Sequence, residues 1–383
     1  SQGHSVRMNH SRRRFLKTGT SAGIVGSLGF NLNLQAAPTA KILDTRIISQ
    51  LPNRYHGWPT LTRRRNGQLL VVCSGGRDQH VCPFGRVDIQ RSNDNGNSWT
   101  YPRTILDGPI DDRDAGVLET MKGSLLVTTF TSLAYVPSLP KDNRKKRWLA
   151  AHNRIPEAQR KAELGQWMIR STDGGITWSE RYPTIVNSPH GPTQLSDGRL
   201  LYAGKKLWSE GKEIGVCESH DDGKSWQWLS AIPTREGDRP QDYHELHAIE
   251  AANGRLIVHI RNHNKKNDRE TLQSESDDGG KSWSKPHAIG VWGLPSFLTR
   301  LRDDSLLMSY GHRRKPLGNQ VRLSKDHGLT WSTPLSISDD GSSGDLGYPS
   351  TVELADNSLL TVWYEKLSGN RFAVLRQTRW TIS

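Results

Sequence analysis

The amino-acid sequence predicts an all-β fold, a six-bladed β-propeller made of four-stranded antiparallel blades. Three observations support this prediction. A turn motif that ends in tryptophan recurs five times, and a turn followed by an apolar run recurs six times at the spacing of one blade. The chain of 383 residues also contains 36 Gly and 13 Trp, and Gly-rich turns between many short strands are typical of all-β proteins.

The first repeat reads Ser-x-Asp-x-Gly-x-(Ser/Thr)-Trp. Its five copies are Ser92–Trp99, Ser171–Trp178, Ser219–Trp226, Ser276–Trp283 and Ser324–Trp331. In each copy the Asp side chain can accept hydrogen bonds from turn amides, and the Gly tolerates a positive φ. The Trp can bury a large apolar surface beside the turn. We therefore expect a hairpin between the last two strands of a blade.

The second repeat is a polar turn, most often Asn-Gly or Asp-Gly, followed by an apolar run, which is a strong hairpin signal. The first Leu of each run is Leu69, Leu125, Leu200, Leu256, Leu306 and Leu359. These residues are separated by 56, 75, 56, 50 and 53 positions. One four-stranded blade with its loops has about this length, so the six runs predict six blades.

The sixth unit carries no copy of the first motif. We expect its blade to combine the last strands, around Arg371–Thr381, with the first strand, around Ile42–Ser49, because this closure removes an exposed sheet edge. The 75-residue interval marks an insertion, and residues 140–166 are polar, basic and compatible with helix. This segment is expected to be a helical excursion between the second and third blades that either walls a substrate site or forms a solvated loop.

The first 37 residues have the features of an export signal. Residues 11–17 read Ser-Arg-Arg-Arg-Phe-Leu-Lys, which resembles the bacterial twin-arginine motif, and a mildly apolar stretch and Ala36-Ala37 follow. The apolar stretch is shorter than the roughly 20 residues of a membrane span. We expect residues 1–37 to be a signal peptide, residues 38–383 to be a propeller without a membrane span, and the protein to be periplasmic or secreted. A basic arm is the alternative.

Charge and cysteine content limit the partners. The net charge is +13, and the first 37 residues contribute five basic residues and no acidic one, which leaves +8 for the rest. This balance suits an anionic substrate or surface, and its spread along the chain argues against nucleic acid. The three cysteines, Cys73, Cys82 and Cys217, have no metal-type spacing, and we expect buried thiols rather than a disulfide framework. No cofactor motif is present, so no cofactor is expected.

The five copies of the first motif are Asp boxes, and at this spacing the chain resembles the sialidase superfamily along nearly its whole length after residue 37. The resemblance implies three arginines that grip a carboxylate, a Tyr nucleophile assisted by a Glu, and an Asp acid/base. Glu245 precedes a turn and Arg261 ends the next strand, which is the register of the sialidase Glu and of one of the arginines. Tyr348 precedes the sixth turn, where the sialidase nucleophile stands.

These residues suit the chemistry that the resemblance implies. A phenol becomes an effective nucleophile when a base removes its proton, and Glu245 would be that base for Tyr348. An Arg fork binds a carboxylate bidentately, which suits Arg261. The third arginine is expected at Arg313, with Arg314 as the second choice, because neighbouring residues of a strand face opposite ways.

Two positions depart from the sialidase pattern. Gly57 stands where those proteins have their first Arg, and Arg54, His56 or Arg113 would then supply the charge. His80 stands where they have the acid/base Asp. A His can perform this role near neutral pH.

The acid/base assignment has alternatives, and a further cluster offers sugar ligands. Asp78 and Asp88 lie close to His80 in sequence and could replace it as the acid/base. The run 111–114 begins the second blade, and Asp112, Arg113 and Asp114 are expected to bind sugar hydroxyls. A hard cation is the weaker reading of this run, so no metal is expected. His190-Gly-Pro192 and Tyr243-His244 occupy similar points on the third and fourth blades.

Three functions follow from these residues. The first is a sialidase-like exo-glycoside hydrolase that releases a terminal acidic sugar, sialic acid or a related sugar acid, from a glycan by a retaining Tyr/Glu mechanism. The second is a propeller polysaccharide lyase with His80 or Tyr348 as base, and the third is a glycan-binding propeller without catalysis. An unsaturated product would identify the lyase, and free acidic sugar would identify the hydrolase.

Overall fold

The computed structural model describes residues 36–141 and 145–383. The predicted signal peptide, residues 1–37, lies outside the described residues except for its last two positions, so export stays a prediction. Within the described ranges, no helix has both the length and the apolarity that crossing a bilayer would require.

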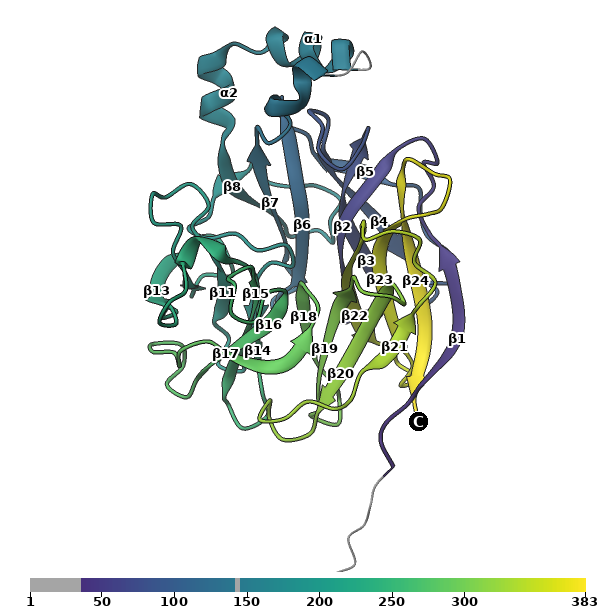
Figure 1. Cartoon of the computed structure of the whole chain (residues 1–383), viewed down its shortest axis with the longest axis vertical. Helices are drawn as coiled ribbons and strands as arrows, with labels where there is room; N and C mark the ends of the chain where they lie inside the picture. The colour runs from purple at the N-terminus through teal and green to yellow at the C-terminus, as the bar shows by residue number, and fades with distance from the viewer. Residues whose placement is uncertain (1–35, 142–144) are drawn as a thin grey trace, which may run out of the picture. The chain divides into compact units, whose positions relative to one another are not determined.

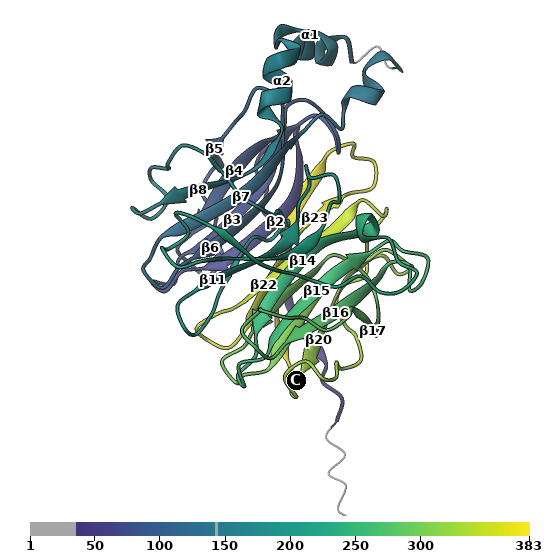
Figure 2. The same ribbon diagram turned by 90° about the vertical axis from the view of Figure 1, so that its left-hand side faces the viewer.

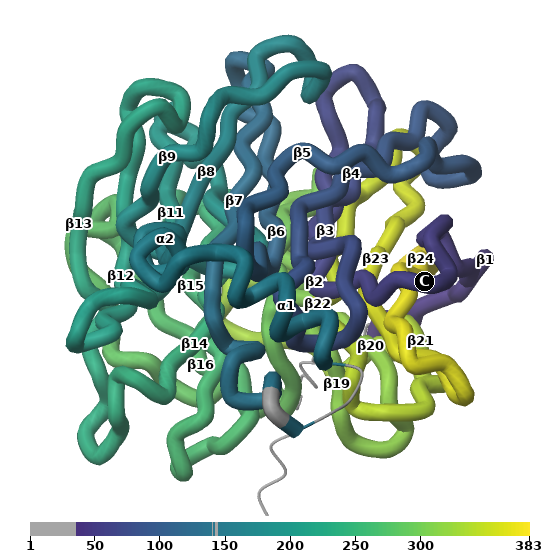
Figure 3. The backbone as a smooth tube through the Cα atoms, turned by 90° about the horizontal axis from the view of Figure 1, so that it is seen from above, coloured from purple at the N-terminus to yellow at the C-terminus, as the bar shows by residue number. Residues whose placement is uncertain are grey.

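The predicted six-bladed propeller is confirmed: residues 40–382 form six four-stranded sheets, each with antiparallel neighbours. The colour in Figure 3 runs around the ring and returns, at β24, to the starting strand β1. The strands of the first three blades are β2 (Tyr55–Arg63), β3 (Leu69–Arg77), β4 (Arg86–Ser92) and β5 (Arg103–Leu106); β6 (Asp111–Glu119), β7 (Leu125–Ser132), β8 (Gly165–Ser171) and β9 (Tyr182–Pro183); and β10 (Thr193–Gln194), β11 (Leu200–Lys205), β12 (Ile214–Ser219) and β13 (Gln227–Ala231).

The other three blades follow the same order, and the last one takes its outer strand from the start of the chain. They are β14 (Tyr243–Glu250), β15 (Leu256–Asn262), β16 (Glu270–Ser276) and β17 (His287–Trp292); β18 (Ser296–Arg300), β19 (Leu306–His312), β20 (Gly318–Ser324) and β21 (Leu335–Ser338); and β22 (Leu346–Glu353), β23 (Leu359–Lys366), β24 (Ala373–Ile382) and β1 (Ala40–Ile47). The expected closure is therefore present, with Thr45 paired to Thr378.

The Asp boxes form the hairpins between the third and fourth strands of five blades. In one copy, Ser219 Oγ donates a hydrogen bond to Asp221 Oδ1 at 2.9 Å and accepts one from the Gly223 amide at 2.9 Å. The Ser225 amide also donates to Asp221 Oδ1, at 2.9 Å. These bonds satisfy the turn amides, as the motif predicts. The core itself consists of apolar clusters packed between and within the blades.

The insertion lies within the second blade, between β7 and β8, and not between the second and third blades as expected. It contains η1 (Val136–Lys141), α1 (Lys146–Arg154) and α2 (Glu157–Glu163), at the top of Figure 1 and Figure 2. Trp148 of α1 is buried in an apolar cluster that includes Cys82 of the β3–β4 loop. The insertion is thus packed onto the first blade through this side chain. All three cysteines are buried free thiols. A further short helix, η3 (Pro240–Asp242), precedes β14.

Candidate active site

Irregular backbone at the inner strands aims side chains at one central cavity. Trp58 on β2, Asp114 on β6, Glu245 on β14 and Tyr348 on β22 all have positive φ, between 31° and 55°. Strand pairing shifts register around each of them. Residues other than glycine rarely adopt a positive φ, and those that do are concentrated at functional sites. All four residues line the same cavity of about 360 Å³.

Tyr348, Glu245 and Arg261 form a closed set of contacts in this cavity. The Tyr348 hydroxyl donates a hydrogen bond to Glu245 Oε1. Arg261 Nη1 donates to Glu245 Oε2 at 2.5 Å and to the Tyr348 hydroxyl oxygen at 3.0 Å. The residues come from blades four and six, and the structure brings together the three groups that the sequence placed at the centre of the site.

The charges of this set follow from its surroundings. Burial opposes ionisation of Glu245, but the Arg261 charge and the hydrogen bonds from Tyr348 and Arg261 outweigh it and lower the pKa of Glu245 to about 2. Burial, together with the Glu245 charge, raises the pKa of Tyr348 well above its ordinary value. The resting site therefore holds a neutral phenol hydrogen-bonded to a carboxylate.

Two further predicted arginines reach the cavity. Arg313 lines it and is held by a hydrogen bond from Nε to the Leu346 carbonyl at 3.1 Å. Arg113 lines it with its guanidinium carbon 4.8 Å from the centroid of the Trp58 ring. The second choice for the third arginine, Arg314, instead lies over Trp292 at 3.9 Å and does not line the cavity.

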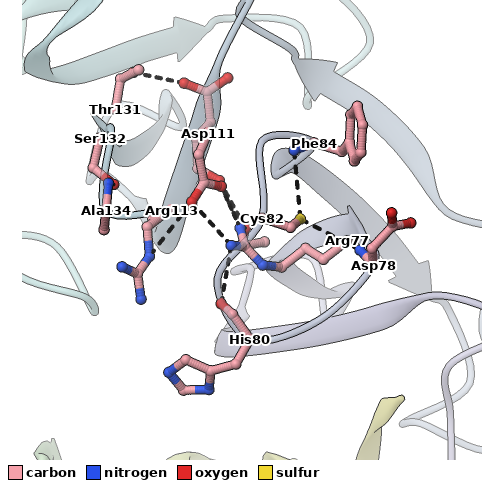
Figure 4. A network of polar contacts seen from close by, with 12 residues as sticks. Arg77, Asp78, His80, Cys82, Phe84, Asp111, Arg113, Thr131, Ser132 and Ala134 are labelled. Carbon is pink, nitrogen blue, oxygen red and sulfur yellow. Dashed lines mark hydrogen bonds and ion pairs between the residues drawn. The ribbon is translucent and has the colours of Figure 1, made fainter. Parts of the chain in front are cut away.

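A buried ion pair behind the cavity was missed by sequence reasoning. Arg77 and Asp111 are both fully buried, with Arg77 Nη1 2.7 Å from Asp111 Oδ1. Figure 4 shows Arg77 and Arg113 both directed at Asp111, and Arg113 Nε lies 4.0 Å from Asp111 Oδ2. Asp111 therefore forms its close ion pair with Arg77, and Arg113, which lies in the cavity, is at the outer limit of an ion pair with the same carboxylate.

Of the acid/base candidates, His80 alone lines the central cavity. Its Nδ1 lies 3.0 Å from Asp345 Oδ1 and 2.9 Å from the Tyr55 hydroxyl. Asp78 instead accepts hydrogen bonds from Arg147 and from Trp148 Nε1. Asp88 is buried against Arg86 and Thr104, so the structure places both alternatives outside the cavity.

Asp114 is a second carboxyl group in the cavity. It is 6% exposed, and burial together with the Glu245 charge raises its pKa to about 7. A buried carboxyl of this kind is neutral below that pH and can donate a hydrogen bond. Its position suits the substrate-binding role expected of it.

Two residues expected to bind substrate lie elsewhere. His56 is buried with Nδ1 3.2 Å from the Ala373 carbonyl oxygen, and it does not line the cavity. Asp112 is fully buried and accepts hydrogen bonds from the Gly108 amide and the Thr131 hydroxyl. These contacts use the polar atoms of Asp112 inside the fold, so we assign neither residue to the substrate.

Of the candidate residues on blades three and four, one lines the cavity and the others do not. His244 lines the cavity, whereas Tyr243 is buried and donates its hydroxyl hydrogen bond to Asp238. His190 lies outside the cavity lining, with Nδ1 2.9 Å from the Thr60 hydroxyl.

Sequence reasoning missed Lys205, which lines the cavity with Nζ 2.6 Å from the Gln241 carbonyl oxygen. Burial, followed by the Lys212 charge, lowers the pKa of Lys205 to about 8.

The carboxylates of the 111–114 run each have a separate environment, so they do not converge on one point. Among the residues that the structure describes, no group of three His, Cys, Asp or Glu side chains is placed to hold a metal ion. What the cavity offers is a set of cations, Arg113, Arg261, Arg313 and Lys205, around a neutral phenol and a carboxylate. This arrangement can bind an anion and activate the phenol.

Comparisons with known proteins place the chain among sialidase-like propellers. A family model described as a BNR repeat-like domain matches residues 134–361. A solved structure of a protein of unknown function from Dyadobacter fermentans DSM 18053 is 20% identical, with 90% of this chain and 99% of that chain covered and a TM-score of 0.72. No curated protein sequence matches this chain.

Two sialidase structures share the fold. The Hadza microbial sialidase Hz136 is 17% identical, with 86% of this chain and 65% of that chain covered and a TM-score of 0.62. The intramolecular trans-sialidase from Ruminococcus gnavus, solved with oseltamivir carboxylate, is 13% identical, with 89% and 97% covered and a TM-score of 0.62. At these identities the likeness concerns the fold, and function has to be argued from the cavity.

Proposed function

Since the chain belongs to the BNR repeat-like family of sialidase-like propellers, we propose that it is a retaining exo-glycoside hydrolase that releases a terminal acidic sugar, sialic acid or a related sugar acid, from glycans. The observation that carries this proposal is the contact set of Tyr348, Glu245 and Arg261 inside the cation-lined central cavity. A neutral nucleophile beside several cations suits a substrate that is itself negatively charged.

In this proposal the arginines of the cavity bind the carboxylate of the substrate. Arg261 and Arg313 line the cavity from blades four and five, and Arg113 lines it from blade two. Planar guanidinium groups bind carboxylates through paired, charge-assisted hydrogen bonds. In this proposal Arg113 supplies the positive charge of the arginine that Gly57 replaces. Arg113 lines the cavity, whereas His56 does not line it and Arg54 is exposed.

In the first chemical step, the Tyr348 oxygen attacks the anomeric carbon and its proton passes to Glu245. The glycosidic C–O bond breaks, and the leaving oxygen takes a proton from His80. Positive charge that develops on the sugar lowers the cost of forming the phenolate, and Arg261 stabilises the phenolate oxygen through the hydrogen bond that it already donates. Asp345 holds Nδ1 of His80, which leaves Nε2 for the leaving group.

In the second step, His80 takes a proton from a water molecule, and the resulting oxygen attacks the anomeric carbon. The bond between the sugar and the Tyr348 oxygen breaks, and Glu245 returns the proton to the phenol. Two displacements at one carbon give a product with the anomeric configuration of the substrate. The enzyme ends in its starting protonation state.

The test is a screen of aryl glycosides of sialic, ulosonic and uronic acids, with Tyr348→Phe as the control. We expect turnover of at least one glycoside by the wild type, and a loss of about 10³-fold or more in Tyr348→Phe, since the nucleophile is gone. Equal turnover by the two proteins would overturn the nucleophile assignment. Release of an unsaturated sugar would indicate a lyase, and binding without turnover would indicate a glycan-binding protein.

A further inference from the structure

A second cavity, of about 570 Å³, adjoins the central one, and His80 lines both. In the proposed reaction His80 protonates the glycosidic oxygen, which joins the two halves of the substrate. An acid in this position has to contact both the sugar that is released and the group that leaves. If the acidic sugar occupies the central cavity, the second cavity lies where the leaving group must be.

The second cavity is lined by residues of three segments, together with Tyr55 and Asp345. The β3–β4 loop contributes Asp78 and His80, the insertion contributes Arg147 and Trp148, and the β23–β24 hairpin contributes Lys366 and Arg371. In Figure 1, the α1 insertion and the turn that joins β23 to β24 lie at the same end of the propeller. The insertion is held in place because Trp148 is buried and its Nε1 donates a hydrogen bond to Asp78 Oδ2 at 2.8 Å.

The charges around this cavity do not cancel. Asp78 is bonded to Arg147 and Trp148, and Asp345 accepts hydrogen bonds from Tyr55 at 2.8 Å and Tyr364 at 3.1 Å. On the hairpin side, Lys366 and Arg371 form no ion pair with any carboxylate of the described residues. Asp78 is thus paired with Arg147 and Asp345 is hydrogen-bonded to two tyrosines. Among the described residues neither carboxylate forms an ion pair with Lys366 or Arg371, and Lys145 also lines the cavity, so the described lining carries an excess of positive charge.

We propose that the second cavity binds the leaving-group part of the substrate and that Lys366 and Arg371 select a leaving-group sugar that carries a sulfate or a carboxylate. The inference rests on the proposed function, because it assigns the other half of the same substrate. Sulfate and carboxylate oxygens accept charge-assisted hydrogen bonds from both Lys and Arg. The substrate is then a glycan with a negative charge on each side of the bond that breaks.

The test uses the full chain and the variant Lys366→Gln/Arg371→Gln. The matched control is Arg103→Gln/Lys224→Gln, which removes one Arg and one Lys from exposed positions that line neither cavity. Calorimetry measures binding of three disaccharides that lack the terminal acidic sugar: N-acetyllactosamine, its 6-sulfate, and a disaccharide that contains glucuronic acid. Turnover of a neutral aryl glycoside of the acidic sugar is measured in parallel.

We expect the wild type and the control to bind an anionic disaccharide, sulfated or uronate-bearing, at least about tenfold more tightly than N-acetyllactosamine, and the cavity variant to lose this preference. Turnover of the neutral aryl glycoside should be unchanged in the cavity variant. Equal binding of the charged and neutral disaccharides by the wild type, or an unchanged preference in the cavity variant, would overturn the inference. If binding depends on Lys366 and Arg371 but no aryl glycoside is turned over, the proposed function fails and the binding site stands.

Discussion

Asp114 on β6 and Glu245 on β14 line the same cavity, and their carboxyl groups lose their protons at widely different pH values. Burial and the Glu245 charge raise the pKa of Asp114 to about 7. Burial also opposes the charge of Glu245, but the ion pair with Arg261 outweighs it and lowers the pKa of Glu245 to about 2. Between these two values the cavity contains one carboxylate and one carboxylic acid, a difference set by Arg261.

Asp114 should therefore limit activity at high pH. Above a pH of about 7 it ionises and adds a second negative charge to a cavity that has to bind an anion. We expect kcat/KM for an acidic sugar to fall as the pH rises through that value, and Asp114→Asn to lose this decline because Asn stays neutral. The pH profiles of the two proteins test this. The same decline in both would assign it to another group.

Asp114 should also affect how the folding stability depends on pH. Between pH 4 and pH 7, approximately, the folded chain retains a proton on Asp114 that the unfolded chain has released. Folding stability should therefore decrease as the pH rises across that window, and Asp114→Asn should decrease less. Chemical denaturation of both proteins at several pH values measures this difference. An equal decrease in stability in the two proteins would contradict the prediction.

Glu245→Gln should remove the base and leave Arg261 without its ion pair. We expect turnover to fall by about 10²- to 10⁴-fold, the usual contribution of a positioned general base, together with a lower Tm. The control is Glu218→Gln, which alters a Glu–Arg pair with Arg199 far from the cavity and should keep full turnover. Retained turnover in Glu245→Gln would remove Glu245 from the mechanism.

Arg113→Gln should weaken recognition of the substrate carboxylate. Hydrogen bonds to charged groups contribute about 1.5–3 kcal/mol, so kcat/KM should fall by roughly 10- to 150-fold, mostly through KM. Arg54→Gln is the matched control, because Arg54 was the other arginine expected near Gly57 and is exposed. A larger loss in Arg54→Gln than in Arg113→Gln would reverse the assignment.

We expect substitution of Asp111 to lower the folding stability. This side chain is fully buried and paired with the fully buried Arg77, and removal of one partner from such a pair costs about 3–5 kcal/mol. Asp111→Asn should show this loss in chemical denaturation. Asp44→Asn, which alters an exposed pair with Arg46, should change stability by less than about 1 kcal/mol. Similar losses in the two variants would contradict the account of the buried pair.

The fold could be predicted because its signals are local. The Asp boxes and the turn-and-run repeats are complete within short stretches of sequence, and their spacing gives the number of blades. Tyr348, Glu245 and Arg261 could be predicted as a group because their positions relative to those repeats match the sialidase pattern. All three lie in one cavity, in direct contact.

The errors come from irregular backbone. His56 was one of the residues expected to replace the charge missing at Gly57, but register shifts on both sides of Gly57 bring Trp58 into the cavity and leave His56 against Ala373. On β6, alternation separates Arg113 from Asp112, and the positive φ of Asp114 returns the next carboxyl to the cavity. Nothing in the local sequence indicates either shift.

Contacts between blades that no motif or family pattern marks were also beyond sequence reasoning. Arg77 and Asp111 are 34 residues apart and meet only because blades one and two pack together. Lys205 reaches the central cavity because β11 lies beside β14, where it contacts His244 at 3.2 Å. Neither residue belongs to a motif, so the packing of neighbouring blades is what reveals them.

In the proposed mechanism Tyr348 attacks the anomeric carbon and is then displaced by water. Proton NMR, recorded during the first minutes of turnover of an aryl glycoside of the acidic sugar, shows which anomer of the free sugar appears first. Two displacements predict the anomer of the substrate, followed by slow equilibration in solution. First appearance of the opposite anomer, or of an unsaturated sugar, would contradict a covalent intermediate on Tyr348.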